Sequence, residues 1–329
     1  MGFGQSKNFG VNSGSNNKVA NNGGTVKTGY QITSFSNIAL GSDPVSISNS
    51  NLKFPNGNPA SNFQINIAVT DTTGATTAPS GVASIESAFQ QIAIIGSSGR
   101  VLWSGNGVFG EIERWQQILN DNQAYVTAPT PADSSTSTAY PVNWYLNLKH
   151  LVIDPSESPL EVVILPNTLS SRASTLNGLT STITSVQVIA DFVPVSNYVK
   201  TQYRTKPLSV SSTGYYDVGT SLDNRLLYAV ALDVGTDAKL NSSNTFLLSQ
   251  NGTTLIPYTP YTSITNVQNS LPAMSSGASN HISGFFPIQT LYKAAIDGSQ
   301  DISLDVNLAS APTGGGQANT LNLYQAEGY

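Results

Sequence analysis

The sequence contains no cysteine. Disulfide bonds, thiol catalysis and cysteine metal ligands are therefore excluded. The chain also has no apolar run close to the roughly 18 residues that a membrane-spanning helix needs. Its N-terminus lacks the apolar core of a secretory signal peptide. We therefore expect a protein that does not cross a membrane and is not exported by that route.

Charged residues are scarce: they make up 10% of the 329 residues, whereas they make up about a quarter of ordinary soluble proteins. No stripe of lysine and arginine with interleaved aromatic residues is present, so we expect no sequence-specific nucleic-acid binding. The uncharged polar residues and glycine are correspondingly frequent: serine, threonine, asparagine, glutamine and glycine. This composition is typical of adhesins, lectins and virion shells rather than of cytosolic enzymes.

Candidates for catalysis are few. The chain has two histidines, His150 and His281, and no H-x-x-x-H, H-E-x-x-H or G-x-S-x-G pattern. Residues far apart in the sequence could still form a catalytic triad or a glycosidase carboxylate pair, and the sequence leaves both open. We predict that the protein is not an enzyme.

Short runs of strand-forming residues between glycines and prolines, of which the chain has 28 and 17, predict an all-β protein with long polar loops. One unit occurs twice, within residues 84–120 and again within residues 246–272. Each copy reads as strand, tight turn, strand and then an amphipathic helix with apolar residues three and four apart. The side chains expected to form the buried helix faces are Phe109, Ile112, Trp115 and Leu119 in the first copy, and Ile264, Val267 and Leu271 in the second.

Three further pairs of segments follow each other in the same order in both halves. They are residues 63–71 with 226–233, 148–154 with 291–297, and 160–165 with 302–308. About eight strand candidates per half predict two consecutive eight-stranded jelly-roll sandwiches, each with a short inserted helix. The expected division is a flexible N-terminal arm at 1–29, a first jelly roll at 30–197, a connector at 198–207 and a second jelly roll at 208–329.

The N-terminal arm is rich in Gly, Asn and Ser and carries Lys7, Lys18 and Lys27, with no acidic residue before Asp43. Such a segment cannot bury enough apolar surface to offset the entropy of ordering it, so we expect it to be flexible unless a partner orders it.

Two patterns resemble ligand sites. Residues 105–110 read G-x-G-x-x-G after a strand, but the alternation of strands and helices that a dinucleotide site requires is missing, and the second copy has Pro257-Tyr258-Thr259-Pro260 at this place. We therefore expect the glycines to serve the turn and the helix entry, and we predict no cofactor. Acidic residues at or near strand ends could bind structural calcium through loop carbonyls, yet Asp before Gly or Pro is more often turn chemistry, so no metal is predicted. These weak calcium candidates are Asp71, Asp154, Asp233, Asp237 and Asp297.

Two consecutive jelly rolls, each with a helix after a strand–turn–strand unit and preceded by a polar arm, resemble the double jelly-roll major capsid proteins. This is the lineage of adenovirus hexon and of tailless phages with an internal membrane, and the length is similar to that of corticovirus-like and finnlakevirus-like coat proteins. The resemblance covers about residues 30–329 and rests on architecture, so it carries over no functional residue.

The resemblance implies a virion protein that is made in the host cytoplasm. It implies that three chains form a pseudo-hexagonal capsomer of an icosahedral capsid, and that minor capsid or vertex proteins join the lattice. The lysines of the arm would face inward, toward neighbouring subunits or the anionic lipid of an internal membrane. The alternative is an extracellular or virion-surface β-sandwich that binds a carbohydrate or a receptor.

Overall fold

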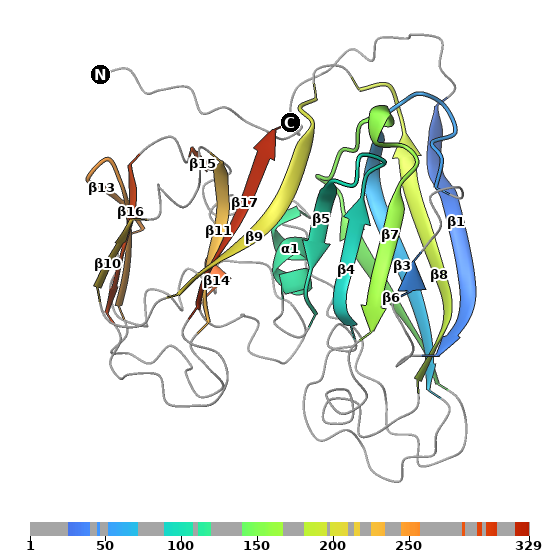
Figure 1. The fold of residues 1–329 in the computed structure, drawn as a ribbon, viewed down its shortest axis with the longest axis horizontal. Helices are drawn as coiled ribbons and strands as arrows, with labels where there is room; N and C mark the ends of the chain where they lie inside the picture. Colours follow the sequence, from blue (N-terminus) through green and yellow to red (C-terminus); the bar gives the residue numbers. More distant parts are fainter. Residues whose placement is uncertain are drawn as a thin grey trace. The chain divides into compact units, whose positions relative to one another are not determined.

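The structure is a computed structural model of the whole chain. It describes residues 26–39, 45–46, 52–71, 89–107, 111–119, 140–166, 181–195, 198–209, 214–217, 225–233, 245–256, 285–286, 295–297, 301–307 and 320–328. The described residues form two compact units, one within residues 26–202 and the other within residues 203–328. Each unit is a pair of antiparallel sheets (Figure 1).

The first unit contains the strands β1 to β8. One of its sheets has the order β1-β8-β3-β6, and the other has the order β2-β7-β4-β5. Each sheet alternates between early and late strands of the unit, which is the arrangement of an eight-stranded jelly roll. The bounds are β1 Lys27–Ala39, β2 Val45–Ser46, β3 Ala60–Asp71, β4 Phe89–Ile95, β5 Val101–Gly105, β6 Tyr140–Leu148, β7 Glu161–Pro166 and β8 Ser181–Phe192.

The core of this unit lies between the two sheets. In β3, Phe63, Ile65 and Ile67 are buried and alternate with polar residues, as expected for a strand with one face in the core. In β7, Val162 and Ile164 alternate in the same way. Because each sheet presents such a face to the other, the period-two pattern of the sequence becomes one contiguous sandwich core.

The second unit repeats this arrangement. One sheet has the order β14-β11-β17-β9, with β15 also paired to β11, and the other has the order β10-β16-β12-β13. The strands β14 and β15 pair with opposite ends of β11, so together they occupy the position of β6 in the first unit. The bounds are β9 Thr201–Ser209, β10 Gly214–Asp217, β11 Leu226–Asp233, β12 Thr245–Gln250, β13 Thr253–Ile256, β14 Phe285–Phe286, β15 Ile296–Asp297, β16 Ile302–Asn307 and β17 Thr320–Gly328.

The predicted fold class and the predicted repeat are confirmed strand by strand. β3 and β11, β4 and β12, β5 and β13, and β7 and β16 hold equivalent positions in their sheets. The Ile-Asp match is structural as well, because Ile153 bridges Ala60 at the start of β3 and Ile296 pairs with Leu227 at the start of β11.

The predicted connector, residues 198–207, is corrected by the structure. Most of it belongs to β9, the edge strand that pairs with β17. Tyr203 is buried against Tyr228 with ring centroids 5.9 Å apart, and burial raises the pKa of both phenols. Arg204 and Lys206 made the segment look like a linker, but charged residues are common on edge strands because they discourage pairing with other chains.

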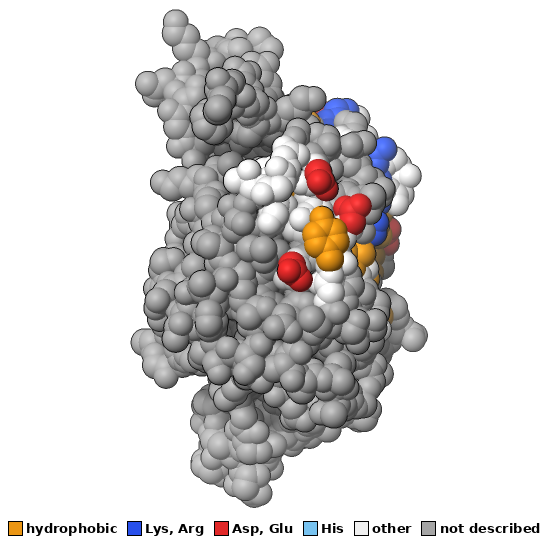
Figure 2. Space-filling model, turned by 90° about the vertical axis from the view of Figure 1, so that its left-hand side faces the viewer, with side chains coloured by type: hydrophobic (Ala, Val, Ile, Leu, Met, Phe, Trp, Pro, Cys, Tyr) orange, Lys and Arg blue, Asp and Glu red, His pale blue; other side chains and the backbone are white. Residues whose placement is uncertain are grey.

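The other sheet of the second unit carries a small exposed face on β10 and β16. Tyr215 and Asp217 lie two residues apart on β10 and are exposed, and Asp305 lies directly opposite Tyr215 on β16. Residues opposite each other on paired strands share one face of a sheet. Figure 2 shows this side of the molecule, where exposed hydrophobic and acidic side chains lie beside one another.

The first inserted helix is present as α1, Glu111–Leu119. The predicted second helix lies outside the described residues. No helix within the described part of the chain is long and apolar enough to span a membrane.

Candidate functional site

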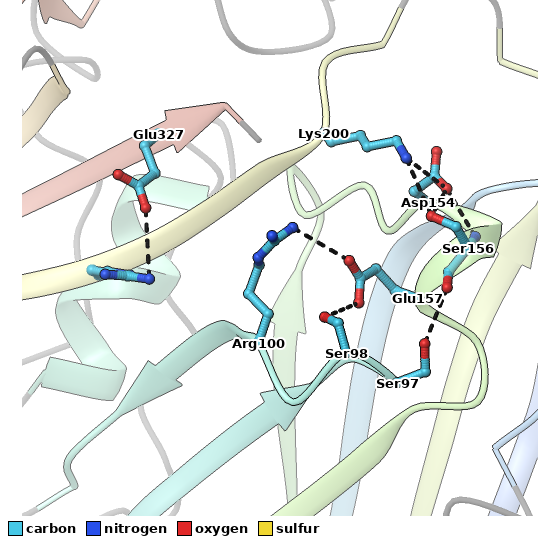
Figure 3. A network of polar contacts seen from close by, with 9 residues as sticks. Ser97, Ser98, Arg100, Asp154, Ser156, Glu157, Lys200 and Glu327 are labelled. Atoms are coloured by element: carbon cyan, nitrogen blue, oxygen red, sulfur yellow. Dashed lines mark hydrogen bonds and ion pairs between the residues drawn. The ribbon is translucent and has the colours of Figure 1, made fainter.

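A polar network joins three segments of the first jelly roll: the β4–β5 turn, the β6–β7 connection and residues 198–200 before β9 (Figure 3). The turn is closed by two backbone hydrogen bonds of 2.9 Å, from the Gly96 N–H to the Arg100 carbonyl and from the Gly99 N–H to the Gly96 carbonyl. Gly99 has a φ of 77°, which a residue with a Cβ rarely adopts. The turn therefore depends on glycine at position 99.

Glu157 fastens this turn to the β6–β7 connection. Its carboxylate is buried, accepts a hydrogen bond of 3.0 Å from the Ser98 hydroxyl and lies 3.5 Å from an Arg100 guanidinium nitrogen. Its backbone carbonyl accepts a hydrogen bond of 2.9 Å from the Ser97 N–H. A Cβ on Gly96 would lie 1.9 Å from the carboxylate. Glycine at position 96 therefore gives the acid the space in which it packs.

Asp154 is the second acid of this network. It caps the short 3-10 helix η3, Pro155–Glu157, by accepting a hydrogen bond of 2.8 Å from the Ser156 N–H. It also accepts hydrogen bonds from the Ser156 hydroxyl and, at 2.7 Å, from the Tyr198 hydroxyl, and it lies 3.3 Å from the Lys200 ammonium. Burial by itself raises the pKa of Asp154, but these hydrogen bonds outweigh it and lower the pKa to about 2.

The second jelly roll repeats one contact of this network. At the β12–β13 turn, the Asn251 N–H donates to the Asp301 carbonyl at 2.8 Å, and the Asn251 side-chain oxygen accepts from the Asp301 N–H at 3.3 Å. The position corresponds to the Ser97–Glu157 contact. The two turns are thus anchored at the same place by the same kind of backbone hydrogen bond, with different side chains around it.

A second ionic cluster lies in the second jelly roll, on three adjacent strands. The Glu327 carboxylate in β17 accepts a hydrogen bond from Arg225, which precedes β11, and lies 3.6 Å from the Arg204 guanidinium in β9. The side chain of Arg204 is 47% exposed, so the second arginine keeps much of its charge at the surface. One carboxylate is shared by two arginines.

The predicted buried face of the first helix is described for three of its four residues. Ile112, Trp115 and Leu119 are fully buried in the first jelly roll. Gly105, the first glycine of the G-x-G-x-x-G pattern, ends β5, and a Cβ there would lie 2.8 Å from the Ile112 side chain. This close approach of strand and helix explains the glycine without a bound dinucleotide. Phe109, Ile264, Val267 and Leu271 lie outside the described residues.

The lysines predicted for the arm fall in two classes. Lys27 is the first residue of β1, where its ammonium lies 4.5 Å from the ring centroid of Tyr30. The structure thus assigns Lys27 to the jelly roll rather than to a flexible arm. Lys7 and Lys18 lie outside the described residues.

The weak calcium candidates that the structure describes lie on separate elements. Asp71 and Asp233 end their strands, Asp297 is in β15, and Asp154 is the hydrogen-bond acceptor described above. Within the described ranges, no three His, Asp or Glu residues are placed to share a metal ion. Asp237 and His281 lie outside these ranges. The contacts of Glu157 and Asp154 are structural: they hold turns in place.

No protein-family model matches the sequence, and no curated protein matches it. Solved structures match its fold. The crystal structure of the major capsid protein of Sulfolobus Turreted Icosahedral Virus aligns with a TM-score of 0.56 at 15% identity, over 92% of this chain and 96% of that chain. PBCV-1 VP54, fitted into a cryo-EM reconstruction of the virophage Sputnik, aligns with a TM-score of 0.54 at 10% identity, over 92% and 93%.

The major capsid protein P2 from bacteriophage PM2 aligns with a TM-score of 0.50 at 9% identity, over 90% of this chain and 97% of that chain. These matches extend over nearly the whole of both chains, so the similarity includes both sandwiches and their order. The chain has the double jelly-roll fold of these major capsid proteins.

Proposed function

We propose that this chain is the major capsid protein of an icosahedral virion. The observation that carries the proposal is the fold: two jelly rolls with equivalent strand order, matched over 92% and 90% of this chain by two of the major capsid proteins described above. The role is structural, and no enzymatic activity is proposed.

Three chains with two jelly rolls each supply six similar units, so a trimer gives a capsomer with pseudo-hexagonal symmetry. Such capsomers would form the lattice together with minor capsid or vertex proteins, in a virion made in the host cytoplasm and built over an internal membrane. The chain contributes a few positive charges per copy through Lys7 and Lys18 in residues 1–25. Attraction of that size to anionic lipid becomes effective only when many copies act together.

The mass of the purified protein in solution tests the proposal. Light scattering on the eluate of a size-exclusion column, over a range of concentrations, should give a constant mass of three times 34.6 kDa. Electron microscopy of the same sample should show compact capsomers and, under assembly conditions, closed shells. A monomer at every concentration would contradict the proposal. Binding to a glycan array by that monomer would instead support a carbohydrate-binding β-sandwich.

A further inference from the structure

One face of the first jelly roll consists mainly of uncharged polar side chains and is partly exposed. It is the side of the sheet β1-β8-β3-β6 that points away from the core, because the residues between its members, such as Ile65 and Val188, are buried. We define the amide face as six described residues of this side, all partly exposed: Gln64, Asn66, Asn147, Ser185, Gln187 and Ile189.

Strand register brings the amides of this face together. On β3, Gln64 lies opposite Asn147 of β6 and opposite Ile189 of β8. Asn66, two residues further along β3, lies opposite Gln187 of β8. Residues opposite each other on paired strands share one face of a sheet, so the four amides form one continuous patch.

Another protein surface can cover the amide face without burying a free charge. None of its six residues is charged. Asp191 lies at its end on β8, and the two oxygens of its carboxylate accept hydrogen bonds of 2.6 Å from the Gly29 N–H and from the Asn62 side chain. Depletion of charged residues is characteristic of the centre of protein interfaces. Amides both donate and accept hydrogen bonds, so they can pair with either kind of group on a partner.

One amide of this face is incomplete in a single chain. The side-chain oxygen of Asn66 is buried and has no hydrogen-bond partner among the described residues. A buried acceptor without a donor costs free energy. A donor on a second molecule removes that cost, so the unpaired oxygen indicates a surface that a partner completes.

The second jelly roll shows the equivalent sheet with both faces covered. Residues 226–230 of β11 and residues 322–326 of β17 are buried without interruption, and these strands are the equivalents of β3 and β8. A strand that is covered on one face alternates between buried and exposed residues, whereas a strand that is covered on both faces is buried throughout. In β3 and β8 burial alternates. The position that is covered in the second jelly roll is therefore partly exposed in the first.

We propose that the amide face of one copy docks on the second jelly roll of a second copy. The proposal rests on the proposed function, because it concerns how three chains form a capsomer. A ring of three chains holds six jelly rolls, and in such a ring the first jelly roll of one copy meets the second jelly roll of the next. The contact joins unlike surfaces, and a head-to-tail contact closes into a ring when the rotation between copies fits. In the ring, the sheet that carries the amide face is covered on both sides, as its equivalent in the second jelly roll is within one chain.

Thiol labelling tests whether the amide face becomes covered. The chain has no cysteine, so a maleimide reacts only with an introduced one. Ser185→Cys probes the amide face. Ser104→Cys is the matched control, because Ser104 is also partly exposed but lies on β5 in the other sheet of the first jelly roll. Labelling requires access to the thiolate, so the rate in Ser185→Cys should fall at least about tenfold from monomer to trimer, while the rate in Ser104→Cys should stay within about twofold.

A charge placed on the amide face tests whether the contact holds the trimer together. Gln187→Glu keeps the shape of the side chain but puts a carboxylate in the contact, where it must lose its water. The protein concentration at which half of the trimers dissociate, measured by light scattering, should therefore rise at least about tenfold. Gln90→Glu is the matched control, since Gln90 is exposed on β4 in the other sheet. Its dissociation midpoint should equal that of the wild type.

Far-UV circular dichroism checks that each variant is folded. The monomer for the labelling experiment comes from dilution below the midpoint, or from the Gln187→Glu background when dilution leaves the trimer intact. The proposed contact is overturned, with the capsid function left standing, by trimers in which Ser185→Cys stays as reactive as in the monomer. The same holds if Gln187→Glu dissociates no more readily than Gln90→Glu. A wild type that is monomeric at every concentration would contradict the capsid function itself.

Discussion

Gly96 and Glu157 offer a test of the network at the end of the first jelly roll, because the Glu157 carboxylate occupies the space that a side chain at position 96 would fill. Replacing Gly96 with Ala would place a Cβ 1.9 Å from the Glu157 carboxylate and 3.2 Å from its Cβ. The backbone at position 96 does not require glycine, since its φ is not in the left-handed region. The cost of Gly96→Ala should therefore come from displacing the carboxylate.

The magnitude follows from the contacts of Glu157. The hydrogen bond from Ser98 to the buried carboxylate is of a kind that contributes about 1.5–3 kcal/mol. The Arg100 side chain is 36% exposed, so its ion pair adds at most about 1 kcal/mol. Glu157→Ala should thus lower the free energy of unfolding by about 2–4 kcal/mol, and Gly96→Ala by a similar amount because it expels the same carboxylate.

The two substitutions should not be additive. Once Glu157 is alanine, the two carboxyl atoms at 1.9 and 2.8 Å are gone and the nearest atom to the added Cβ is the Cβ of residue 157 at 3.2 Å. The double variant should therefore lose about 2–4 kcal/mol rather than about 4–8 kcal/mol. Denaturant unfolding followed by tryptophan fluorescence measures this, since all three tryptophans lie in the sequence of the first jelly roll. Gly57→Ala is the matched control, because a Cβ there meets nothing within 4 Å. Additive losses in the double variant would refute the steric argument.

Four further outcomes are expected. The pKa of Asp154 falls from 3.8 to about 2 on folding, so its carboxylate stabilises the fold fully above about pH 3.8 and loses this effect as the pH falls toward 2. Asp154→Asn should remove that part of the pH dependence of the free energy of unfolding. Gly105→Ala should lower the fluorescence-monitored stability by about 1–3 kcal/mol through overpacking against Ile112. Gly252→Ala, at a φ of 71°, should speed hydrogen exchange in the β12–β13 hairpin by about tenfold, equivalent to about 1.4 kcal/mol. Deletion of residues 1–25 removes no residue of the described sheets, so circular dichroism and the unfolding midpoint should be unchanged while capsomer assembly is impaired.

The order of the strands was predictable because each signal for it is local. Alternating apolar residues such as those of β3 identify a strand with one buried face. Gly99 at the β4–β5 turn and Asn251-Gly252 at the β12–β13 turn separate consecutive strands through positive φ values. Repetition of these local signals in the same order was sufficient to predict two equivalent sandwiches.

The polar contacts were not predictable because they join residues far apart in the sequence. Glu157 meets Gly96 only after the β6–β7 connection has folded against the β4–β5 turn, and no motif connects the two positions. Asp154 ends a matched segment, a place where an acid could bind calcium, but its partners include Tyr198 and Lys200, more than forty residues away. The segment that became β9 was assigned to a connector for the same reason: its pairing with β17, not its composition, makes it a strand.

The repeated turn anchor separates what the fold requires from what each half adds. In both jelly rolls the turn after the fourth strand, β4 or β12, is tied to the residues just before β7 or β16. The tie is a hydrogen bond from a backbone N–H to a backbone carbonyl. In the first half the residue that supplies the carbonyl, Glu157, also buries a carboxylate, whereas Asp301 in the second half is exposed. In the second half the backbone hydrogen bond is supplemented by the Asn251 side-chain oxygen, which accepts from the Asp301 N–H, so this turn is anchored without a buried acid. Equivalent positions thus hold a buried acid with side-chain partners in one jelly roll and an exposed acid in the other.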